Sequence, residues 1–366
     1  MDVSRWDNVL VLQTSFLGDT VLTLPLLSEI KRRFPTTKLS VLCSPLGKEL
    51  LRDYPGVDEV IVDDKKGADK GWSGLWRKAS LLKQKGFTMA LSPHKSLRSA
   101  LLLFLAGVPF RVGFRESQGW FLFQGRVKRN VKRHDVERNL SILEVFGIRP
   151  EECQCVLDWD SEPKIQESVS RLCRSLGVEP GGLIVGINPG SVWPTKRWTT
   201  QGFARVIELL KQKYPCDILL FGGPEDAALV SKVQELCGGL AVSMVGKLTL
   251  RELPAALGLC KLFITNDSGP MHIAVAKKVP TVAIFCSTTP SLGFYPYSAH
   301  AIVLQKDLPC RPCSSHGGKR CPLGTEDCIR LIEPEHVLQA VDRLLDGRRV
   351  ADSVIGHRCE PEFVTV

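Results

Sequence analysis

The sequence lacks a hydrophobic run long enough to cross a membrane. Its longest apolar stretch, ALLLFLAGVPF at residues 100–110, has about half the length of a membrane-spanning helix. The first residues, MDVSRWDN, also lack the apolar segment that directs a chain to export. We therefore expect a globular protein that remains in the cytoplasm and places no segment inside a bilayer.

The cysteines lack the paired spacing of a disulfide framework, because their number, 13, is odd and they are spread along the chain. In a reducing compartment most such thiols serve as small buried hydrophobic groups. The last four form a separate cluster: Cys310, Cys313, Cys321 and Cys328. A structural zinc site, a disulfide or redox pair, and simple packing all remain open for this cluster. The six residues between its last two members are more than a zinc ribbon has.

Acidic residues are scarce in the first 150 positions, which hold 25 Lys and Arg against 15 Asp and Glu. The net charge of the whole chain is +9, so the excess belongs entirely to this part. Such asymmetry predicts an anionic partner, either phosphate-bearing lipid, acidic sugar or nucleic acid, although a basic surface can also serve solubility alone. Nucleic acid is disfavoured because the basic run at residues 126–138 lacks interleaved aromatic residues.

The chain has 366 residues, enough for two domains of ordinary size. Short apolar segments alternate with helical stretches in both halves, which predicts the α/β class with parallel sheets covered on both faces. We expect two Rossmann-like domains facing an interdomain cleft, at residues 1–160 and 161–350, and a tail at residues 351–366. The expected strands are residues 9–12, 39–43, 59–62, 89–91 and 111–113, then 183–187, 217–221, 242–245, 262–265 and 281–285.

The stretch TSFLGDTVLTLP at residues 14–25 follows the first expected strand. Gly18 permits a tight turn, and Asp19 then begins a helix. An Asp at this place can cap the helix, and a carboxylate beyond the carboxyl end of a strand can also act as a general base. The small residues Thr14 and Ser15 keep the loop accessible to a ligand. Both roles remain open from this motif alone.

Three further loops follow expected strands in the second half. In INPGSVWPTKRW the turn at Ser191 and the cation of Lys196 precede a helix, which is the outline of a phosphate site without the spacing of a Walker loop. FGGPED contains Gly222, which permits close backbone approach and is otherwise an ordinary turn residue. ITNDSGPMHIA predicts a second diphosphate site, formed by Asp267, Ser268 and Gly269. His272 in the same motif is either a further ligand or a helix histidine whose hydrogen bonds are satisfied.

Read together, these loops resemble one known family. The motifs LGDTVLTLP, NPGSVWPTKRW, FGGPED, VGKLTLRELPAAL, FITNDSGPMHIAVA and CRPCSSHGGKRCPLGTEDC are similar to those of glycosyltransferase family nine. This is the ADP-heptose:lipopolysaccharide heptosyltransferase family, and the cysteine-rich ending is most similar to its heptosyltransferase II branch. The resemblance extends from about residue 8 to about residue 345.

The resemblance implies a GT-B fold and an inverting, metal-independent transfer of L-glycero-D-manno-heptose from ADP-heptose to the inner core of lipopolysaccharide. It assigns Asp19 as the base that deprotonates the acceptor hydroxyl. Lys196 would pair with the donor phosphates, and Asp267, Ser268 and Gly269 would hold the donor. We expect no cofactor, and peripheral contact with the anionic cytoplasmic face of the inner membrane. Gln13 departs from the family pattern, since relatives often have a basic residue there. This difference bears on the expected geometry of acceptor binding.

The acceptor would be bound by the basic first half, and the candidate residues are Ser15, Lys95, Arg98 and Arg115. An Asp-Trp-Asp segment at residues 158–160 resembles the metal motif of another transferase fold, but it lies in the expected interdomain connection.

Three alternative functions remain. The chain can use another nucleotide-sugar or acceptor, can be a GT-B nucleotide-sugar epimerase, or can bind acidic glycolipid without catalysis.

Overall fold

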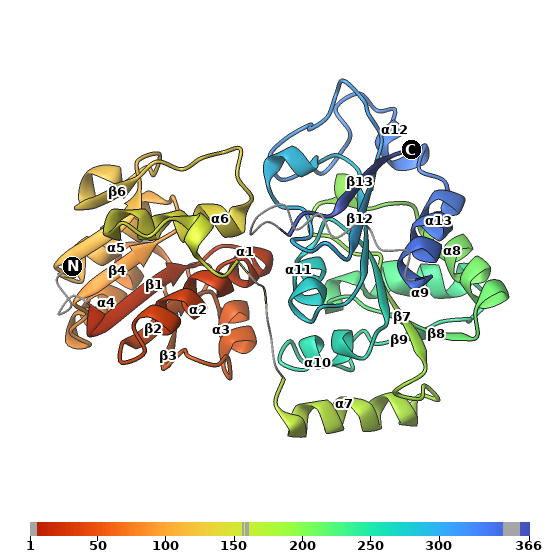
Figure 1. Ribbon diagram of the computed structural model, residues 1–366, viewed down its shortest axis with the longest axis horizontal. Helices are drawn as coiled ribbons and strands as arrows, with labels where there is room; N and C mark the ends of the chain where they lie inside the picture. The colour runs from red at the N-terminus through yellow and green to blue at the C-terminus, as the bar shows by residue number, and fades with distance from the viewer. Residues whose placement is uncertain (1–5, 156, 158–160, 347–358) are drawn as a thin grey trace. The chain divides into compact units, whose positions relative to one another are not determined.

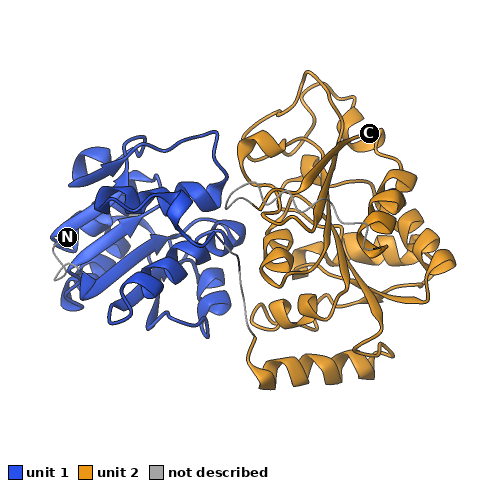
Figure 2. Ribbon diagram, viewed as in Figure 1, with its two compact units in different colours: residues 1–157 blue, residues 158–366 orange. Residues whose placement is uncertain are grey.

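The computed structural model describes residues 6–155, 157, 161–346 and 359–366. The chain divides into two compact units, residues 1–157 and 158–366 (Figure 2). This division falls close to the expected one at residues 160 and 161. The Asp-Trp-Asp segment lies outside the described residues. Among the helices that are described, each is too short or too polar to span a bilayer.

Unit 1 contains a six-stranded sheet in the order β3-β2-β1-β4-β5-β6, and all neighbours pair in parallel (Figure 1). Its strands are β1 (Asn8–Gln13), β2 (Lys38–Cys43), β3 (Glu59–Val62), β4 (Met89–Ser92), β5 (Phe110–Phe114) and β6 (Gly125–Val127). The central strands are buried runs of Val and Leu, as expected for a parallel sheet covered on both faces. The sequence predicted the first five strands and missed the three-residue β6.

The helices of unit 1 follow the strands in the manner of a doubly wound fold. They are α1 (Leu17–Val21), α2 (Leu24–Arg33), α3 (Pro45–Leu51), α4 (Gly71–Gln84), α5 (Leu97–Leu105) and α6 (Asp135–Leu140), with the 3-10 helices η2 (Trp120–Leu122), η3 (Ser141–Phe146) and η4 (Pro150–Glu152). The sequence did not predict α5, because most of its residues are apolar and a short apolar run does not by itself distinguish a helix from a strand.

Unit 2 contains a seven-stranded parallel sheet in the order β13-β12-β11-β10-β7-β8-β9. Its strands are β7 (Leu183–Asn188), β8 (Cys216–Leu220), β9 (Val242–Ser243), β10 (Leu262–Asn266), β11 (Thr281–Phe285), β12 (Ala301–Gln305) and β13 (Glu362–Thr365). Part of the expected tail is therefore an edge strand, because residues 362–365 pair with β12 and continue the sheet.

The helices of unit 2 complete the second layered fold (Figure 1). They are α7 (Pro163–Ser175), α8 (Thr200–Lys213), α9 (Ala227–Leu236), α10 (Leu253–Gly258), α11 (Gly269–Ala276), α12 (Asp327–Arg330) and α13 (Pro334–Leu345), with η5 (Pro194–Lys196), η6 (Pro224–Asp226) and η7 (Pro290–Leu292). Buried Trp198 packs edge-on against Phe203, and its indole nitrogen donates to the carbonyl of Ile332 over 3.0 Å. These contacts anchor the loop after β7 to the core.

Both sheets have a point at which the order of the strands reverses. In unit 1 it lies between β1 and β4, and in unit 2 between β7 and β10. Ligands of open α/β sheets bind beyond the carboxyl ends of the strands at such points. Helix α1, which contains Asp19, follows β1, while η5 with Lys196 follows β7 and Asp267 follows β10. The fold therefore places three sequence motifs at its two switch points.

Candidate active site

The centre of the site on unit 2 is an ion pair. The Nζ atom of Lys196, at the end of η5, lies 2.6 Å from Oδ2 of Asp267, which follows β10. The same carboxylate oxygen accepts a hydrogen bond of 2.7 Å from the hydroxyl of Thr288. Asp267 is buried, whereas the side chain of Lys196 remains 15% exposed. Asp267 thus fixes the ammonium group of Lys196 in a position that a ligand can still reach.

Two asparagines at the ends of neighbouring strands connect the two loops of this site by hydrogen bonds. The amide nitrogen of Asn188 donates to the carbonyl of Gly190 over 3.1 Å and to the hydroxyl of Ser268 over 3.2 Å. That of Asn266 donates to the carbonyl of Pro189 over 2.8 Å. Because β7 and β10 are adjacent, each asparagine ties its own loop to the other. Neither asparagine was predicted as a site residue, although each lies inside a selected motif, INPGSVWPTKRW or ITNDSGPMHIA.

The N-terminus of α11 lies at the same place. Ser268 is its N-cap residue, but the Ser268 side chain makes no capping hydrogen bond. It bonds instead with the hydroxyl of Thr265, 3.0 Å away, and with Asn188. The N–H groups at the start of a helix have no partner inside the helix and favour an anion. The turn that starts at Gly269 can therefore receive a phosphate group.

His272 lies one turn into α11 and is buried. Its Nδ1 atom has no hydrogen-bond partner in the described part of the chain. Burial lowers the pKa of the imidazole to about 4, and the neighbouring charges of Asp267 and Lys196 act on it in opposite directions. The histidine is therefore neutral at ordinary pH. Of the two interpretations left open, a fully satisfied helix histidine does not describe this residue.

Ser191 contacts Asp267, and Gly222 packs against Asp226. The hydroxyl of Ser191 is buried and donates to the backbone carbonyl of Asp267 over 3.1 Å. A Cβ at Gly222 would lie 2.9 Å from that of Asp226, and one at Gly190 only 2.4 Å from its Oδ2. A side chain at either position would therefore force Asp226 to move. Burial raises the pKa of Asp226.

The cysteine-rich segment packs on the loop that contains Lys196. The backbone of Thr195 donates to the carbonyl of Gly318 over 3.2 Å, and the backbone of Gly318 donates to the Thr195 hydroxyl over 2.8 Å. The backbone of Cys313 donates to the carbonyl of Ser287 over 3.1 Å. All four cysteines, Cys310, Cys313, Cys321 and Cys328, are free thiols. Within the described residues no His, Cys, Asp or Glu cluster is arranged to hold a metal ion.

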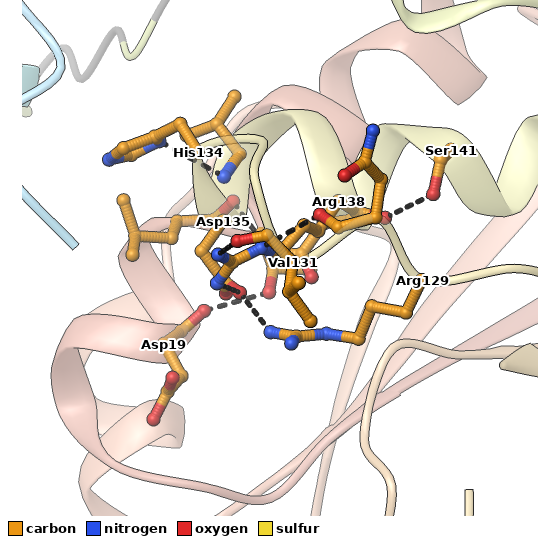
Figure 3. A network of polar contacts seen from close by, with 12 residues as sticks. Asp19, Arg129, Val131, His134, Asp135, Arg138 and Ser141 are labelled. Carbon is orange, nitrogen blue, oxygen red and sulfur yellow. Dashed lines mark hydrogen bonds and ion pairs between the residues drawn. The ribbon is translucent and has the colours of Figure 1, made fainter. Parts of the chain in front are cut away.

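On unit 1, Asp19 is the third residue of α1 and not its N-cap residue, which is Phe16. One carboxylate oxygen of Asp19 accepts a hydrogen bond of 3.1 Å from the backbone of Phe16. It therefore stabilises the start of the helix by reaching back across the first turn. Figure 3 shows that Asp19 also lies beside a network of arginines and acids.

That network is centred on Asp135, at the start of α6 (Figure 3). Asp135 forms ion pairs with Arg129 over 2.6 Å and with Arg138 over 3.4 Å. Lys95 belongs to the same surroundings, because burial lowers its pKa and the charges of Arg129, Asp135 and Arg138 act on it. Lys95, Arg129 and Arg138 thus gather near Asp19 together with the carboxylates of Asp135 and Glu116, so groups of both charges are present here.

The other residues expected to bind an acceptor differ in their contacts. Arg98 forms an ion pair with buried Asp63 and donates to the carbonyl of Asp69 over 2.9 Å, so its guanidinium is already engaged within the unit. Ser15 is half-buried, and its backbone donates to the side chain of Gln13 over 3.3 Å. Gln13, the departure from the family pattern, therefore shapes this loop. Arg115 is exposed.

Two residues near this loop were missed by the sequence analysis. The Nζ atom of Lys65 donates to the hydroxyl of Thr14 over 2.9 Å, and burial lowers the pKa of this amine. His94 lies 2.7 Å from the hydroxyl of Ser99, and burial lowers the pKa of its imidazole to about 4. Neither belongs to a motif, because Lys65 follows β3 in a polar stretch and His94 follows β4 singly.

The chain is similar to known proteins of one family. Residues 75–322 match the family model "Glycosyltransferase family 9 (heptosyltransferase)". The lipooligosaccharide heptosyltransferase 2 of Campylobacter jejuni subsp. jejuni is 28% identical over 90% of this chain and 96% of its own. A family 9 glycosyl transferase from Veillonella parvula, 27% identical, superposes with a TM-score of 0.83 over 93% of this chain and 97% of its own.

The ADP-heptose lipopolysaccharide heptosyltransferase II of Escherichia coli, 22% identical, has the same fold with a TM-score of 0.76 over 93% of this chain and 99% of its own. The expected α/β class and GT-B fold are therefore confirmed.

Proposed function

Since the chain belongs to glycosyltransferase family 9, we propose that it transfers L-glycero-D-manno-heptose from ADP-heptose to the inner core of lipopolysaccharide. The observation that carries this proposal is the ion pair of Lys196 and Asp267 at the N-terminus of α11. A cation and free helix N–H groups at one switch point suit a diphosphate. The relatives named for heptose transfer align with nearly the whole chain.

On the donor side, the β-phosphate of the departing ADP gains a negative charge that must be stabilised as the glycosidic bond breaks. Lys196 supplies a positive charge, and the first turn of α11 supplies N–H donors. Asp267 positions Lys196 and, with Ser268 and Gly269, lies where the donor sugar and diphosphate would bind. We propose His272, Ser191 and Gly222 as supporting residues of this donor site.

On the acceptor side, Asp19 is the proposed base. It takes the proton of the acceptor hydroxyl, whose oxygen forms the new bond to the anomeric carbon. The bond from that carbon to the phosphate oxygen of ADP breaks on the opposite face, so the configuration inverts. Lys95, Arg115 and Ser15 are proposed to contact the acidic sugars and phosphates of the core. Arg98, which was also expected to bind the acceptor, is paired with Asp63, and we propose that it stabilises this surface.

We propose that transfer requires no metal ion, because Lys196 and the α11 N-terminus together supply the positive potential that the leaving diphosphate needs. A lipid-linked acceptor also implies a place of action at the cytoplasmic face of the inner membrane. The positive charge of the first 150 residues supports contact with the anionic surface there.

The test is incubation of the purified protein with ADP-heptose and heptose-free inner core, following ADP release and acceptor mass. We expect stoichiometric ADP release and an acceptor heavier by one heptose. Absence of transfer at saturating donor would contradict the proposal. Transfer from a different nucleotide-sugar would identify another family 9 activity, and conversion of the nucleotide-sugar without acceptor would identify an epimerase.

A further inference from the structure

Four large apolar side chains remain exposed on α5 and η2, and we call them the α5–η2 patch: Leu97, Phe104, Trp120 and Phe121. The two elements are packed closely, since a Cβ at Gly119 would lie 2.4 Å from that of Ala100. Arg111 joins their far ends: it donates to the carbonyl of Leu122 over 2.9 Å, and its guanidinium lies 5.4 Å from the Phe104 ring centroid. Contiguous exposed apolar surface on a protein marks an interaction site.

Helix α4 packs against α5 and carries a second aromatic pair. Trp72 and Trp76 are one helical turn apart, and their exposed fractions are 70% and 56%. The core-facing residues of α4 are different ones, among them Leu75, Ala79 and Leu82. The two indoles are therefore not needed to hold the helix on the sheet. Exposing such large rings to water is unfavourable unless a partner covers them.

Cations lie directly beside the patch. The guanidinium of Arg126 stacks over the Trp120 ring at 5.3 Å from its centroid. Arg115, Trp120, Gln124 and Arg126 line a hollow of about 580 Å³. In the part of the chain that the structure describes, Arg115 and Arg126 form no ion pair with an acidic side chain. Two guanidinium groups thus remain available for an anion next to an apolar surface.

We propose that the α5–η2 patch, with Trp72 and Trp76, is the surface by which this protein docks on an anionic lipid bilayer. Tryptophan and phenylalanine favour the level of the headgroups, where their rings are partly inserted. Arg126, which stacks on Trp120, would bind a lipid phosphate in the adjacent hollow. The unpaired arginines beside the rings favour a phosphate surface over an apolar protein groove. This inference rests on the proposed function only in that the acceptor is carried by a lipid.

The test is co-sedimentation of the full chain with vesicles of phosphatidylglycerol mixed into phosphatidylcholine, without any substrate. We expect binding that weakens at high salt, because the electrostatic part is screened. The variant Phe104→Ser with Phe121→Ser should bind at least about tenfold more weakly, since it removes two inserted rings. The matched control is Leu240→Ser with Leu331→Ser, which removes two exposed apolar side chains from unit 2 and should bind like the wild type.

The proposal is overturned if the wild type does not bind the anionic vesicles, if it binds pure phosphatidylcholine equally well, or if the patch variant binds like the wild type. Equal circular-dichroism spectra and melting temperatures for all variants establish that they are folded. Transfer to a lipid-free core saccharide is measured in parallel and should be the same in the patch variant. If the wild type fails in that assay, the proposed transfer is wrong, whereas vesicle binding is judged separately.

Discussion

The Nζ atom of Lys196 lies 2.6 Å from Oδ2 of Asp267, although the two residues belong to loops after different strands. They meet because β7 and β10 are neighbours at the switch point of the sheet in unit 2. The pair places a cation at the N-terminus of α11, and a diphosphate can bind where these groups converge. The donor chemistry proposed for this chain depends on that relationship.

Lys196→Ala removes this cation. We expect kcat to fall by about 10²–10³-fold, which is typical for the loss of one group that stabilises developing negative charge. Steady-state kinetics with ADP release as the readout measures the change. Lys261→Ala removes an exposed lysine elsewhere in unit 2 and serves as the matched control. An unchanged kcat in Lys196→Ala would exclude Lys196 from stabilising the leaving group.

Asp19→Asn separates the two roles of Asp19. The asparagine oxygen can still accept the hydrogen bond from the backbone of Phe16, so the start of α1 should remain stable. It cannot take a proton, and turnover should therefore fall by about 10²-fold or more. Isothermal titration should show unchanged ADP binding, and thermal melting an unchanged midpoint. If turnover is retained, Asp19 only stabilises its helix.

Gly317→Ala tests the contact between the cysteine-rich segment and Lys196. Gly317 has a φ of +87°, and a Cβ there would lie 3.0 Å from Cγ of Lys196. Gly324 has a φ of +74° with no atom near such a Cβ, so Gly324→Ala carries similar backbone strain, about 1–2 kcal/mol, without the contact. We expect both variants to lose stability in chemical unfolding, and only Gly317→Ala to lose kcat beyond that. Equal kcat values would show that the segment does not position Lys196.

Arg98→Ala should act on stability. It leaves the buried carboxylate of Asp63 without its ion-pair partner, and such a loss costs about 3 kcal/mol. Arg115→Ala removes an exposed arginine without an acidic partner among the described residues, and should change the free energy of unfolding by less than about 0.5 kcal/mol while raising the KM for the acceptor. Urea unfolding and acceptor titration distinguish the two variants. A reversed pattern would make Arg98 the acceptor contact.

His272 should make the protein sensitive to acid. Its pKa is lowered by burial to about 4, whereas an unfolded histidine titrates near 6.5. Below pH 6.5 the unfolded chain binds a proton that the folded chain does not, so stability falls as the pH drops from about 6.5 to about 4. The loss reaches about 3 kcal/mol at most. Urea unfolding across this range should show a smaller loss in His272→Gln than in the wild type or the exposed control His300→Gln. The same slope in all three would contradict this.

Much of the fold could be predicted from the sequence, because buried parallel strands are short runs of Val, Ile and Leu between helical stretches. The alternation of strands and helices also predicted which segments follow strands, and these segments contain Asp19, Lys196 and Asp267. Other elements were missed, among them strand β12, although its residues AIVLQ are a buried apolar run. Helix α5 is nearly all apolar, and β13 lies in a segment that looks like a tail.

What the sequence determined by itself was the order of the elements and which residue types stand at the ends of strands, since both follow from local patterns of hydrophobicity and turn chemistry. Only the tertiary structure decided which charges meet. It engages Arg98 with Asp63, gathers Arg129 and Arg138 around Asp135, and joins Lys196 to Asp267. The physical reason is that charge and spacing along a chain do not reveal a partner, because partners far apart in sequence are brought together by the order in which strands pair.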